Sequence, residues 1–385
     1  MISLRFLKGM VTSTDQSSID VLRRGYFGKM HGTELQLDPE EALYLIDVRN
    51  AQCSSQKGSV SFNGLASRFC RSGKFIARYF TYKDWRDRGL VALRPFNLAA
   101  KAAIAAKQYP GSDLRLPKIS VNGLFFKSDL MTIIDDSEHG RELYDRFWFG
   151  QYGSYKAADR GRLNKLDTYE TIFLISKGIL NLENSDRAEV TRLASSRRSD
   201  FGKLYGVYKD WRDRGYVIKT GFKFGTHFRA YFPGAHPVIQ GEGEKSWHHS
   251  KHVIHVFPKE SKLLISEWAR AIRVAHSVRK TFILAVPGIL SGKKTNIDFV
   301  LYHRKGGNAE TPDTDMPKYA MLSLSEEETI GGSEFASAIR AANDMGLSLV
   351  IAIADRETAV TYYKVRQIDL QKSRNEYYEI EWMQP

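Results

Sequence analysis

Residues 82–89 read Tyr-Lys-Asp-Trp-Arg-Asp-Arg-Gly, and the same eight residues return unchanged at 208–215. An identical octapeptide that contains a tryptophan does not easily arise by chance, so we infer an internal duplication. Because the octapeptide occurs in both copies, we expect it to serve helix ends and an interface rather than a single active site.

The likeness continues upstream of the octapeptide. Residues 37–46 match residues 166–175, and in each copy an aspartate stands ahead of an apolar helix that its side chain can cap. Further upstream, Phe27-Gly28 matches Phe149-Gly150, and the second copy has seven more residues between this glycine and the helix. The sequence therefore predicts two α/β lobes of the same kind, the second with an insertion.

A second duplication lies toward the other end of the chain. Residues 267–275 parallel residues 334–342, and in both segments apolar residues follow the i, i+4, i+7 spacing of a helix with one buried face. Each helix precedes an apolar run, 281–286 or 347–354, that is typical of a buried strand. This pattern predicts two lobes in which a helix packs on a small sheet.

Together the duplications predict a mixed α/β fold in six consecutive parts. These are an N-lobe (1–98), a linker (99–117), a second N-lobe (118–215), a C-lobe (216–304), a second linker (305–318) and a second C-lobe (319–385). Both linkers are rich in turn-forming residues, and we expect neither to enter a core.

The composition favours a folded protein that binds a polyanion. Hydrophobic residues make up 42% of the 385 residues, and the formal net charge is +13 at pH 7. Such an excess of positive charge is typical of proteins that bind nucleic acids or anionic membranes. The longest apolar runs, 281–290 and 347–354, are too short to span a bilayer, and the N-terminus lacks the apolar segment of a secretion signal. We therefore expect a cytoplasmic protein with a nucleic-acid partner and no membrane association.

Cysteine and histidine patterns give no sign of a bound metal. The two cysteines, Cys53 and Cys70, lie outside any zinc spacing. Six of the ten histidines lie between His227 and His255, but they form none of the familiar zinc-binding patterns. We expect no metal and no cofactor.

Residues 208–280 carry the most specific pattern in the chain. They contain Tyr-x-Asp-Trp-Arg-x-Arg-Gly-Tyr-Val-x-Lys-Thr-Gly-Phe-Lys-Phe-Gly-x-x-Phe-Arg-x-Tyr, then His-Ser, then Arg-Lys ahead of an apolar strand. This pattern resembles the archaeal tRNA-splicing endonucleases, metal-independent enzymes that excise introns from precursor tRNA. The close match covers roughly a fifth of the chain, and the two duplications extend it in outline to nearly all of it.

The order of the lobes resembles the three-unit, homodimeric form of these enzymes. In that form one complete catalytic unit, here residues 118–304, is flanked by an extra N-lobe and an extra C-lobe that serve as a structural partner. The resemblance implies a homodimer with two active sites, which matches the two cuts that remove one intron. It leaves open which acidic loop docks on the partner.

The resemblance also implies the catalytic residues. The family's tyrosine, histidine and lysine fall on Tyr231, His249 and Lys280, with His252 as the alternative histidine because the connection before His249 is longer than in the family. Their roles would be general base, general acid and stabilisation of charge on the phosphate. The products would carry a 2′,3′-cyclic phosphate and a 5′-hydroxyl.

These residue types suit a reaction in which the 2′-hydroxyl of the RNA attacks the phosphorus. An imidazole has an ordinary pKa of about 6.5 and can act as an acid at neutral pH, and an ammonium can bind phosphate oxygens. A phenol has an ordinary pKa of about 10, so Tyr231 needs a nearby cation to act as a base, and Lys280 is the candidate.

The second C-lobe lacks these groups. The position of Lys280 is taken by Leu347, and the segment 319–339 contains no histidine. The first N-lobe also ends without the Gly-Phe-Lys-Phe-Gly stretch. We therefore expect catalysis only in the central unit.

Several basic residues are candidates for RNA binding. Arg273 matches a family arginine that stacks on a bulged base, and Arg304 is a weaker candidate for the opposite face of that base. The insertion lies within residues 151–165 and resembles a loop of those endonucleases that accept irregular junctions as well as the bulge-helix-bulge. Its basic residues are Lys156, Arg160, Arg162 and Lys165.

Two other functions remain open. A metal-dependent nuclease is one, with Asp298 and Glu267 as possible ligands. The other is a non-catalytic RNA-binding or structural subunit that depends on a separate catalytic chain.

Overall fold

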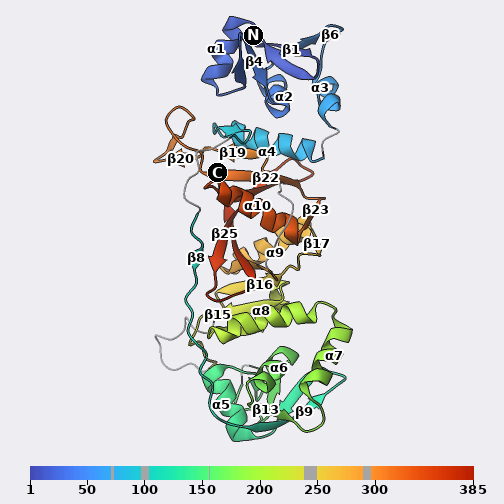
Figure 1. Ribbon diagram of the computed structural model, residues 1–385, viewed down its shortest axis with the longest axis vertical. Helices are drawn as coiled ribbons and strands as arrows, with labels where there is room; N and C mark the ends of the chain where they lie inside the picture. The colour runs from blue at the N-terminus through green and yellow to red at the C-terminus, as the bar shows by residue number, and fades with distance from the viewer. Residues whose placement is uncertain (71–72, 97–103, 156, 238–248, 289–295) are drawn as a thin grey trace.

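The chain forms an elongated molecule in which one long sheet lies between two smaller α/β lobes (Figure 1). The computed structural model describes residues 1–70, 73–96, 104–155, 157–237, 249–288 and 296–385. None of the helices in these ranges, the longest of which have 13 residues, is long and apolar enough to cross a membrane.

The first lobe is a six-stranded sheet covered by helices. Its elements are β1 (Ser3–Leu7), β2 (Met10–Ser13), α1 (Gln16–Arg24), β3 (Lys29–His31), β4 (Glu34–Leu37), α2 (Pro39–Val48), β5 (Gln52–Ser55), β6 (Gly58–Ser59), α3 (Phe62–Phe69) and α4 (Phe75–Asp87). The strand order is β3-β4-β2-β1-β5-β6, and only β1 and β5 are parallel neighbours.

The second lobe repeats this plan. Its elements are β9 (Val121–Phe126), β10 (Met131–Ile134), α5 (Ser137–Phe147), β11 (Gln151–Tyr152), β12 (Asn164–Leu166), α6 (Thr168–Ser176), β13 (Leu180–Leu182), α7 (Arg187–Arg197) and α8 (Phe201–Asp213). The strand order β11-β12-β10-β9-β13 matches β3-β4-β2-β1-β5, again with one parallel pair. The predicted duplication of the N-lobes is therefore confirmed, and the insertion lies at the tip of the β11–β12 hairpin.

The matched sequence positions make the same contacts in both lobes. The predicted capping aspartates precede α2 and α6, and each forms a capping box with the glutamate three residues later, Glu41 or Glu170. Glu41 also accepts a hydrogen bond from the Gly28 N–H, as Glu170 does from Gly150. Both glycines have a positive φ, and a Cβ on Gly150 would lie 2.0 Å from an Asn164 oxygen, so glycine is required there.

The central sheet contains ten strands in one path. The remaining elements are β7 (Ala92–Leu93), β8 (Lys107–Gln108), β14 (Val217–Thr220), η1 (Phe222–Phe224), β15 (Phe228–Tyr231), β16 (His252–Val256), β17 (Lys262–Leu264), α9 (Ile265–Ser277), β18 (Thr281–Val286), β19 (Phe299–Leu301), β20 (Arg304–Lys305), β21 (Asn308–Ala309), β22 (Tyr319–Ser325), β23 (Thr329–Gly331), α10 (Gly332–Asp344), β24 (Ser348–Ala354), β25 (Val360–Asp369) and β26 (Glu376–Met383). The path runs β14-β15-β16-β18-β26-β25-β24-β22-β19-β7, and β8 pairs with β25 off this path.

The sheet consists of two five-strand halves that mirror one another in order. We call β14, β15, β16, β18 and β26 the first half, and β7, β19, β22, β24 and β25 the second half. Alternate residues of a strand face opposite sides, so Phe282 and Leu284 join the core with α9 and α10, while Ile283 and Ala285 join the core with α8. The helices α9 and α10 therefore cover one face, and α4 and α8 cover the other.

The two halves exchange strands. The predicted C-lobe 216–304 ends in β19, but β19 pairs with β22 and β7 in the second half. The first half is closed instead by β26, which pairs with β18. The spatial halves thus differ from the sequence division at residue 304, because one strand at the end of each predicted C-lobe, β19 or β26, lies in the other half.

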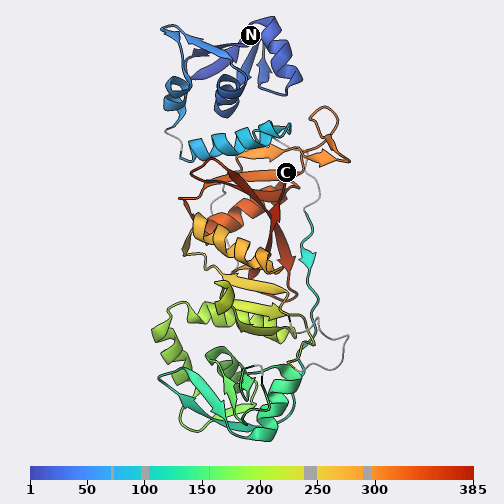
Figure 2. The same ribbon diagram turned by 180° about the vertical axis from the view of Figure 1, so that it is seen from behind.

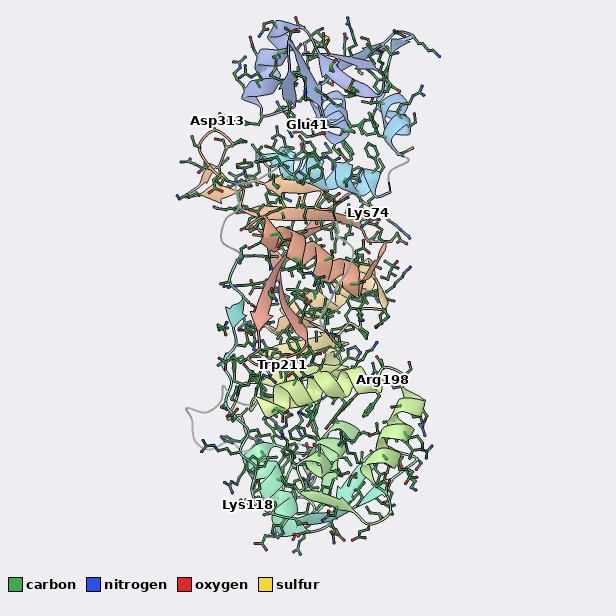
Figure 3. All side chains as sticks on the ribbon, in the orientation of Figure 1. Glu41, Lys74, Lys118, Arg198, Trp211 and Asp313 are labelled. Atoms are coloured by element: carbon green, nitrogen blue, oxygen red, sulfur yellow. The ribbon has the colours of Figure 1, made fainter. Side chains whose placement is uncertain are left out.

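The duplicated octapeptide holds the hairpin of β25 and β26 in the middle of the sheet. Asp84 accepts a hydrogen bond from the Tyr362 hydroxyl at 2.7 Å, and Asp210 accepts one from the Tyr377 hydroxyl at 2.6 Å. The two octapeptide tryptophans pack on the same tyrosine rings, with 5.4 Å between ring centres in each pair; Figure 3 labels Trp211 where α8 faces the sheet. The predicted interface role is confirmed.

The first predicted linker, 99–117, does enter a core, contrary to expectation. The segment containing β8 runs along one side of the sheet in Figure 1 and Figure 2. Tyr109 is only 4% exposed and donates a hydrogen bond to the buried Glu379, which also accepts from Lys107 at 2.8 Å. The polar, turn-rich sequence gave no sign that Tyr109 is buried or that Leu114 and Leu116 pack against the same core. The second linker, 305–318, contains the small β20–β21 hairpin.

Candidate active site

The predicted catalytic residues lie at one edge of the first half of the sheet, where three neighbouring strands end or begin. β15 ends at Tyr231, and the next strand, β16, begins directly after Lys251, whose N–H donates to the Ala230 carbonyl at 3.1 Å. On the other side, the Thr281 N–H donates to the Lys251 carbonyl at 3.0 Å. Tyr231, Lys251 and Lys280 therefore occupy neighbouring positions across the sheet.

Lys280 is positioned by the end of α9. Arg279 adopts a left-handed conformation just past the helix, and the Lys280 N–H donates to the Ala275 carbonyl. The Lys280 ammonium donates to the Ser250 carbonyl at 2.6 Å and lies 5.2 Å from the centre of the Phe224 ring. Burial, followed by the charges of Arg229 and Lys251, lowers the pKa of Lys280.

The phenol of Tyr231 is buried, and the residue lies at the end of β15. Its ring centre lies 4.6 Å from that of Trp148, which follows α5 in the second lobe. Burial raises the pKa of Tyr231, the nearby charge of Arg229 lowers it, and Tyr155 raises it. The cation that acts on this phenol is thus Arg229 rather than the expected Lys280.

The two candidate histidines differ in their surroundings. His249 is exposed and directly precedes Ser250, whose carbonyl accepts from Lys280, so its backbone lies beside the lysine. His252 is 6% exposed between the rings of Tyr109 and Phe232, and burial, aided by nearby lysines, lowers its pKa to about 3. A histidine with that pKa is neutral at physiological pH and lacks the imidazolium proton that a general acid donates. These surroundings favour His249 as the acid.

The Gly-Phe-Lys-Phe-Gly stretch forms a tight turn around η1 beside the site. Phe224 points its ring toward Lys280 and packs on the core below α9. Lys223 donates to the Tyr155 hydroxyl at 3.2 Å, and its ammonium lies 4.8 Å from the centre of that ring. The turn therefore connects the insertion of the second lobe with the predicted catalytic lysine.

The predicted basic loop is described only in part, and Lys156 lies outside the described residues. Arg160 and Arg162 are exposed. Lys165 lies on β12 and donates to the Gly153 carbonyl at the other end of the loop, so it helps to fix the loop's shape. Since Tyr155 reaches Lys223, the loop lies next to the predicted catalytic residues.

The two predicted stacking arginines are far apart. Arg273 is exposed on α9, and its charge holds down the pKa of Tyr363, which burial raises. Arg304 lies on β20 beyond the second half of the sheet, where it donates to the Arg88 carbonyl at 2.6 Å. Within one chain, Arg304 does not reach the edge where Lys280 lies, because the strands of both halves separate them (Figure 1).

The second half of the sheet contains a degenerate counterpart of the site. Tyr319 pairs with Ser348 as His252 pairs with Thr281, so Leu347, 3% exposed, occupies the position of Lys280. Tyr302 follows β19 as Tyr231 ends β15, and Met316 stands where the first half has His249. The counterpart thus retains a tyrosine but has neither the histidine nor the lysine.

Of the two residues considered as metal ligands, Asp298 is engaged elsewhere, and Glu267 lies exposed in the first turn of α9. Asp298 accepts from the Ser323 N–H at 2.8 Å and faces Arg78, and burial raises its pKa to about 6. In the described ranges, no three histidine, cysteine or acidic side chains form a group suited to a metal.

Sequence reasoning missed three residues around the site, namely Arg229, Trp148 and Tyr155. Arg229 was detectable in principle, because it stands two residues before Tyr231 and alternate strand residues share a face. Trp148 and Tyr155 come from the second lobe, and no sequence spacing indicates their approach.

Known protein families match two regions of the chain. Residues 201–295 match the catalytic C-terminal domain of the tRNA intron endonucleases, and residues 2–64 match the N-terminal domain of the same enzymes.

Several archaeal proteins are similar to this chain. A tRNA-splicing endonuclease of Methanopyrus kandleri is 34% identical over 156 residues, which is 39% of this chain and 80% of that protein. One from Methanosarcina barkeri is 26% identical over 345 residues, covering 73% of this chain and 94% of that protein. One from Methanococcoides burtonii is 33% identical over 175 residues, or 44% of this chain and 46% of that protein.

Proposed function

This chain belongs to the family of archaeal tRNA-splicing endonucleases, the tRNA intron endonucleases, and from that premise we propose how it cuts its substrate. As a member of the family it is an endoribonuclease of tRNA intron excision. The proposal is that it cleaves precursor tRNA at bulge-helix-bulge and related junctions without a metal ion. It would leave a 2′,3′-cyclic phosphate and a 5′-hydroxyl.

The observation that carries this proposal is the register across β15, β16 and β18. It brings the positions of Tyr231, Lys251 and Lys280 side by side, and Lys280 bonds to the residue after His249. In the proposed reaction Tyr231 accepts the proton of the 2′-hydroxyl, and His249 protonates the leaving 5′-oxygen. Lys280 stabilises the charge that develops on the phosphate oxygens.

The electrostatics of the site are consistent with these roles. Arg229, Lys251 and Lys280 form a group of positive charges that would attract the phosphate, and the charge of Arg229 favours the phenolate of Tyr231. Lys280 already donates to a carbonyl, so a bound phosphate would compete with the Ser250 carbonyl for its ammonium.

The central experiment is cleavage of an intron-containing precursor tRNA by the purified chain in excess EDTA. Wild type should cut at both junctions, while His249→Ala and Lys280→Ala should each lose roughly 100-fold or more in rate. The 5′ product should resist phosphatase until acid opens its cyclic end. Activity that disappears with EDTA and returns with a divalent ion would support the metal-dependent alternative instead.

A matched control is available within the same chain. Tyr231→Phe should reduce cleavage strongly, whereas Tyr302→Phe removes the corresponding hydroxyl from the degenerate counterpart and should leave the rate within about 2-fold, as for substitutions away from the reacting atoms. Equal losses of cleavage rate in both variants would argue against Tyr231 as the general base. An inactive wild-type chain that still binds the RNA would favour the non-catalytic alternative.

We also propose that the β11–β12 loop broadens the range of accepted junctions. Its exposed arginines, Arg160 and Arg162, lie next to the site and can contact phosphates without reading sequence. Alanine at Lys156 and Lys165 should reduce cleavage of irregular junctions more than cleavage of the symmetric junction. If both junction types are cut as by wild type, this part of the proposal is wrong.

Finally, we propose that the chain acts as a homodimer. One chain has a single set of the proposed catalytic residues, because the counterpart in the second half has lost two of the three. Two cuts on one intron are then most simply made by two chains.

A further inference from the structure

The two aromatic side chains with the largest exposed fractions among the described residues lie on two segments that meet beside the candidate site. Phe222 is 87% exposed and Tyr155 is 58% exposed. They come from different lobes, and Lys223 joins them because it follows Phe222 in the chain and donates to the Tyr155 hydroxyl. Single exposed apolar side chains are ordinary, but two large exposed aromatics on adjoining segments beside a cationic site are not.

The turn that presents Phe222 is tightly packed. Its backbone is closed by hydrogen bonds from the Phe224 N–H to the Gly221 carbonyl at 2.8 Å and from the Gly221 N–H to the His227 carbonyl at 3.0 Å. A Cβ on Gly221 would lie 2.4 Å from the Thr226 hydroxyl, so the turn is packed to the backbone. The hydrogen bonds and packing of the turn therefore fix the backbone of Phe222 while its side chain stays exposed to solvent.

The side chains of the three residues of η1 have three different surroundings. Phe224 packs inward under the Lys280 ammonium, and Lys223 binds the loop of the second lobe. Phe222 has no such contact among the described residues and exposes an apolar face next to the group of positive charges. Unpaired bases of RNA present flat faces that stack on exposed aromatic rings, while nearby cations bind their phosphates.

We propose that Phe222, with Tyr155 beside the same turn, is a stacking platform for an unpaired base adjacent to the scissile phosphate. This inference rests on the proposed function, because it names the part of the substrate that the site holds. The platform would position the phosphodiester over Lys280 without reading the identity of the base, since every base has a face that can stack.

The test measures binding apart from cleavage. The probe is a junction RNA with a 2′-deoxy nucleotide at the scissile position, which removes the attacking hydroxyl, and with fluorescent 2-aminopurine at each unpaired position in turn. Wild type should quench one of these positions on binding. Phe222→Leu keeps an apolar side chain but loses the ring, so it should abolish that quenching and weaken binding roughly 5- to 150-fold.

Two further variants make the result specific. Phe222→Trp should restore both quenching and affinity, because it restores a stacking face. Phe126→Ala removes another exposed ring, 43% exposed on β9 away from the site, and should bind as wild type does. Because cleavage is blocked in this assay, it tests stacking alone. A wild-type chain that failed to cut unmodified RNA would refute the proposed chemistry but would not affect the stacking result.

Wild-type quenching and affinity in Phe222→Leu would overturn the inference. So would a change in oligomeric state of Phe222→Leu with unchanged RNA binding, because the aromatic would then serve a protein contact.

Discussion

Arg229 lies two residues before Tyr231 on β15, and its guanidinium carbon is 5.7 Å from the centre of the tyrosine ring. Burial alone would keep the Tyr231 phenol protonated, and the charge of Arg229 acts against that effect. Arg229 is thus a positioning residue for the proposed base. The balance between burial and this single charge decides how readily the phenol loses its proton.

Replacing Arg229 tests this balance. In Arg229→Met the side chain keeps its bulk but loses its charge, so the pKa of Tyr231 should rise. The rising limb of the rate-versus-pH profile should move to higher pH, with a loss at neutral pH smaller than the roughly 100-fold expected for Tyr231→Phe. Arg192→Met, on α7, is the control. A decrease in cleavage rate that is uniform at all pH values would indicate a merely structural role for Arg229.

His252 should make the protein sensitive to acid. Its pKa is about 3 in the folded chain and about 6.5 when unfolded, so its stabilising contribution is complete above pH 6.5 and is lost as the pH falls toward 3. At pH 5 the loss amounts to roughly 2 kcal/mol.

The matching experiment compares unfolding of wild type and His252→Met at pH 7 and pH 5. The variant should lose less stability on acidification than wild type, because methionine has nothing to protonate. His31→Met, at an exposed position, should follow wild type. Equal acid sensitivity in all three proteins would contradict the role given to His252.

At the scale of elements, the duplicated octapeptide illustrates how far sequence can reach. The repeat and its helix-end position were predictable, because an exact repeat of eight residues is visible in the sequence itself. Its partners were not, because Tyr362 and Tyr377 lie 278 and 167 residues beyond the aspartates that bind them. Likewise, the positions of Tyr231 and Lys280 followed from the motif, whereas Trp148 and Tyr155 depend on how the second lobe docks.

The octapeptide contacts predict matched losses of stability. Tyr377→Phe removes the hydroxyl that donates to Asp210, and Tyr362→Phe does the same for Asp84. Each should lower the free energy of unfolding by about 1.5–3 kcal/mol, the usual value for a hydrogen bond to a charged group. Because the two pairs share no residue, the losses should add in the double variant. Denaturant unfolding measures this, and no loss in either single variant would refute the role of the contacts.

At the scale of the whole molecule, the chain combines two sheet halves of which one has the complete set of proposed catalytic residues. The sequence predicted the lobes and the loss of the lysine at Leu347, since both follow from simple offsets. It did not predict the exchange of β19 and β26, because strand pairing depends on contacts that leave no periodic signal. The sequence boundary at residue 304 therefore divides the chain where the fold does not.

A homodimer with one site per chain predicts a specific intermediate. When wild type is mixed and re-assembled with an excess of His249→Ala, most active dimers should contain one working site. Such dimers should cut one junction and accumulate RNA that still carries the intron at the other end. Electrophoresis of the products would reveal this species. If the gel shows only uncut RNA and RNA cut at both junctions, one chain performs both cuts.

The position of β26 has a consequence for biosynthesis. The ribosome makes β14 to β18 about a hundred residues before it makes the strand, Glu376–Met383, that covers the open edge of β18. Until that strand emerges, the nascent first half presents an unpaired edge on which other chains can add. The first half of the sheet is therefore closed only after the strands of the second half have been made, so the two halves have to assemble together.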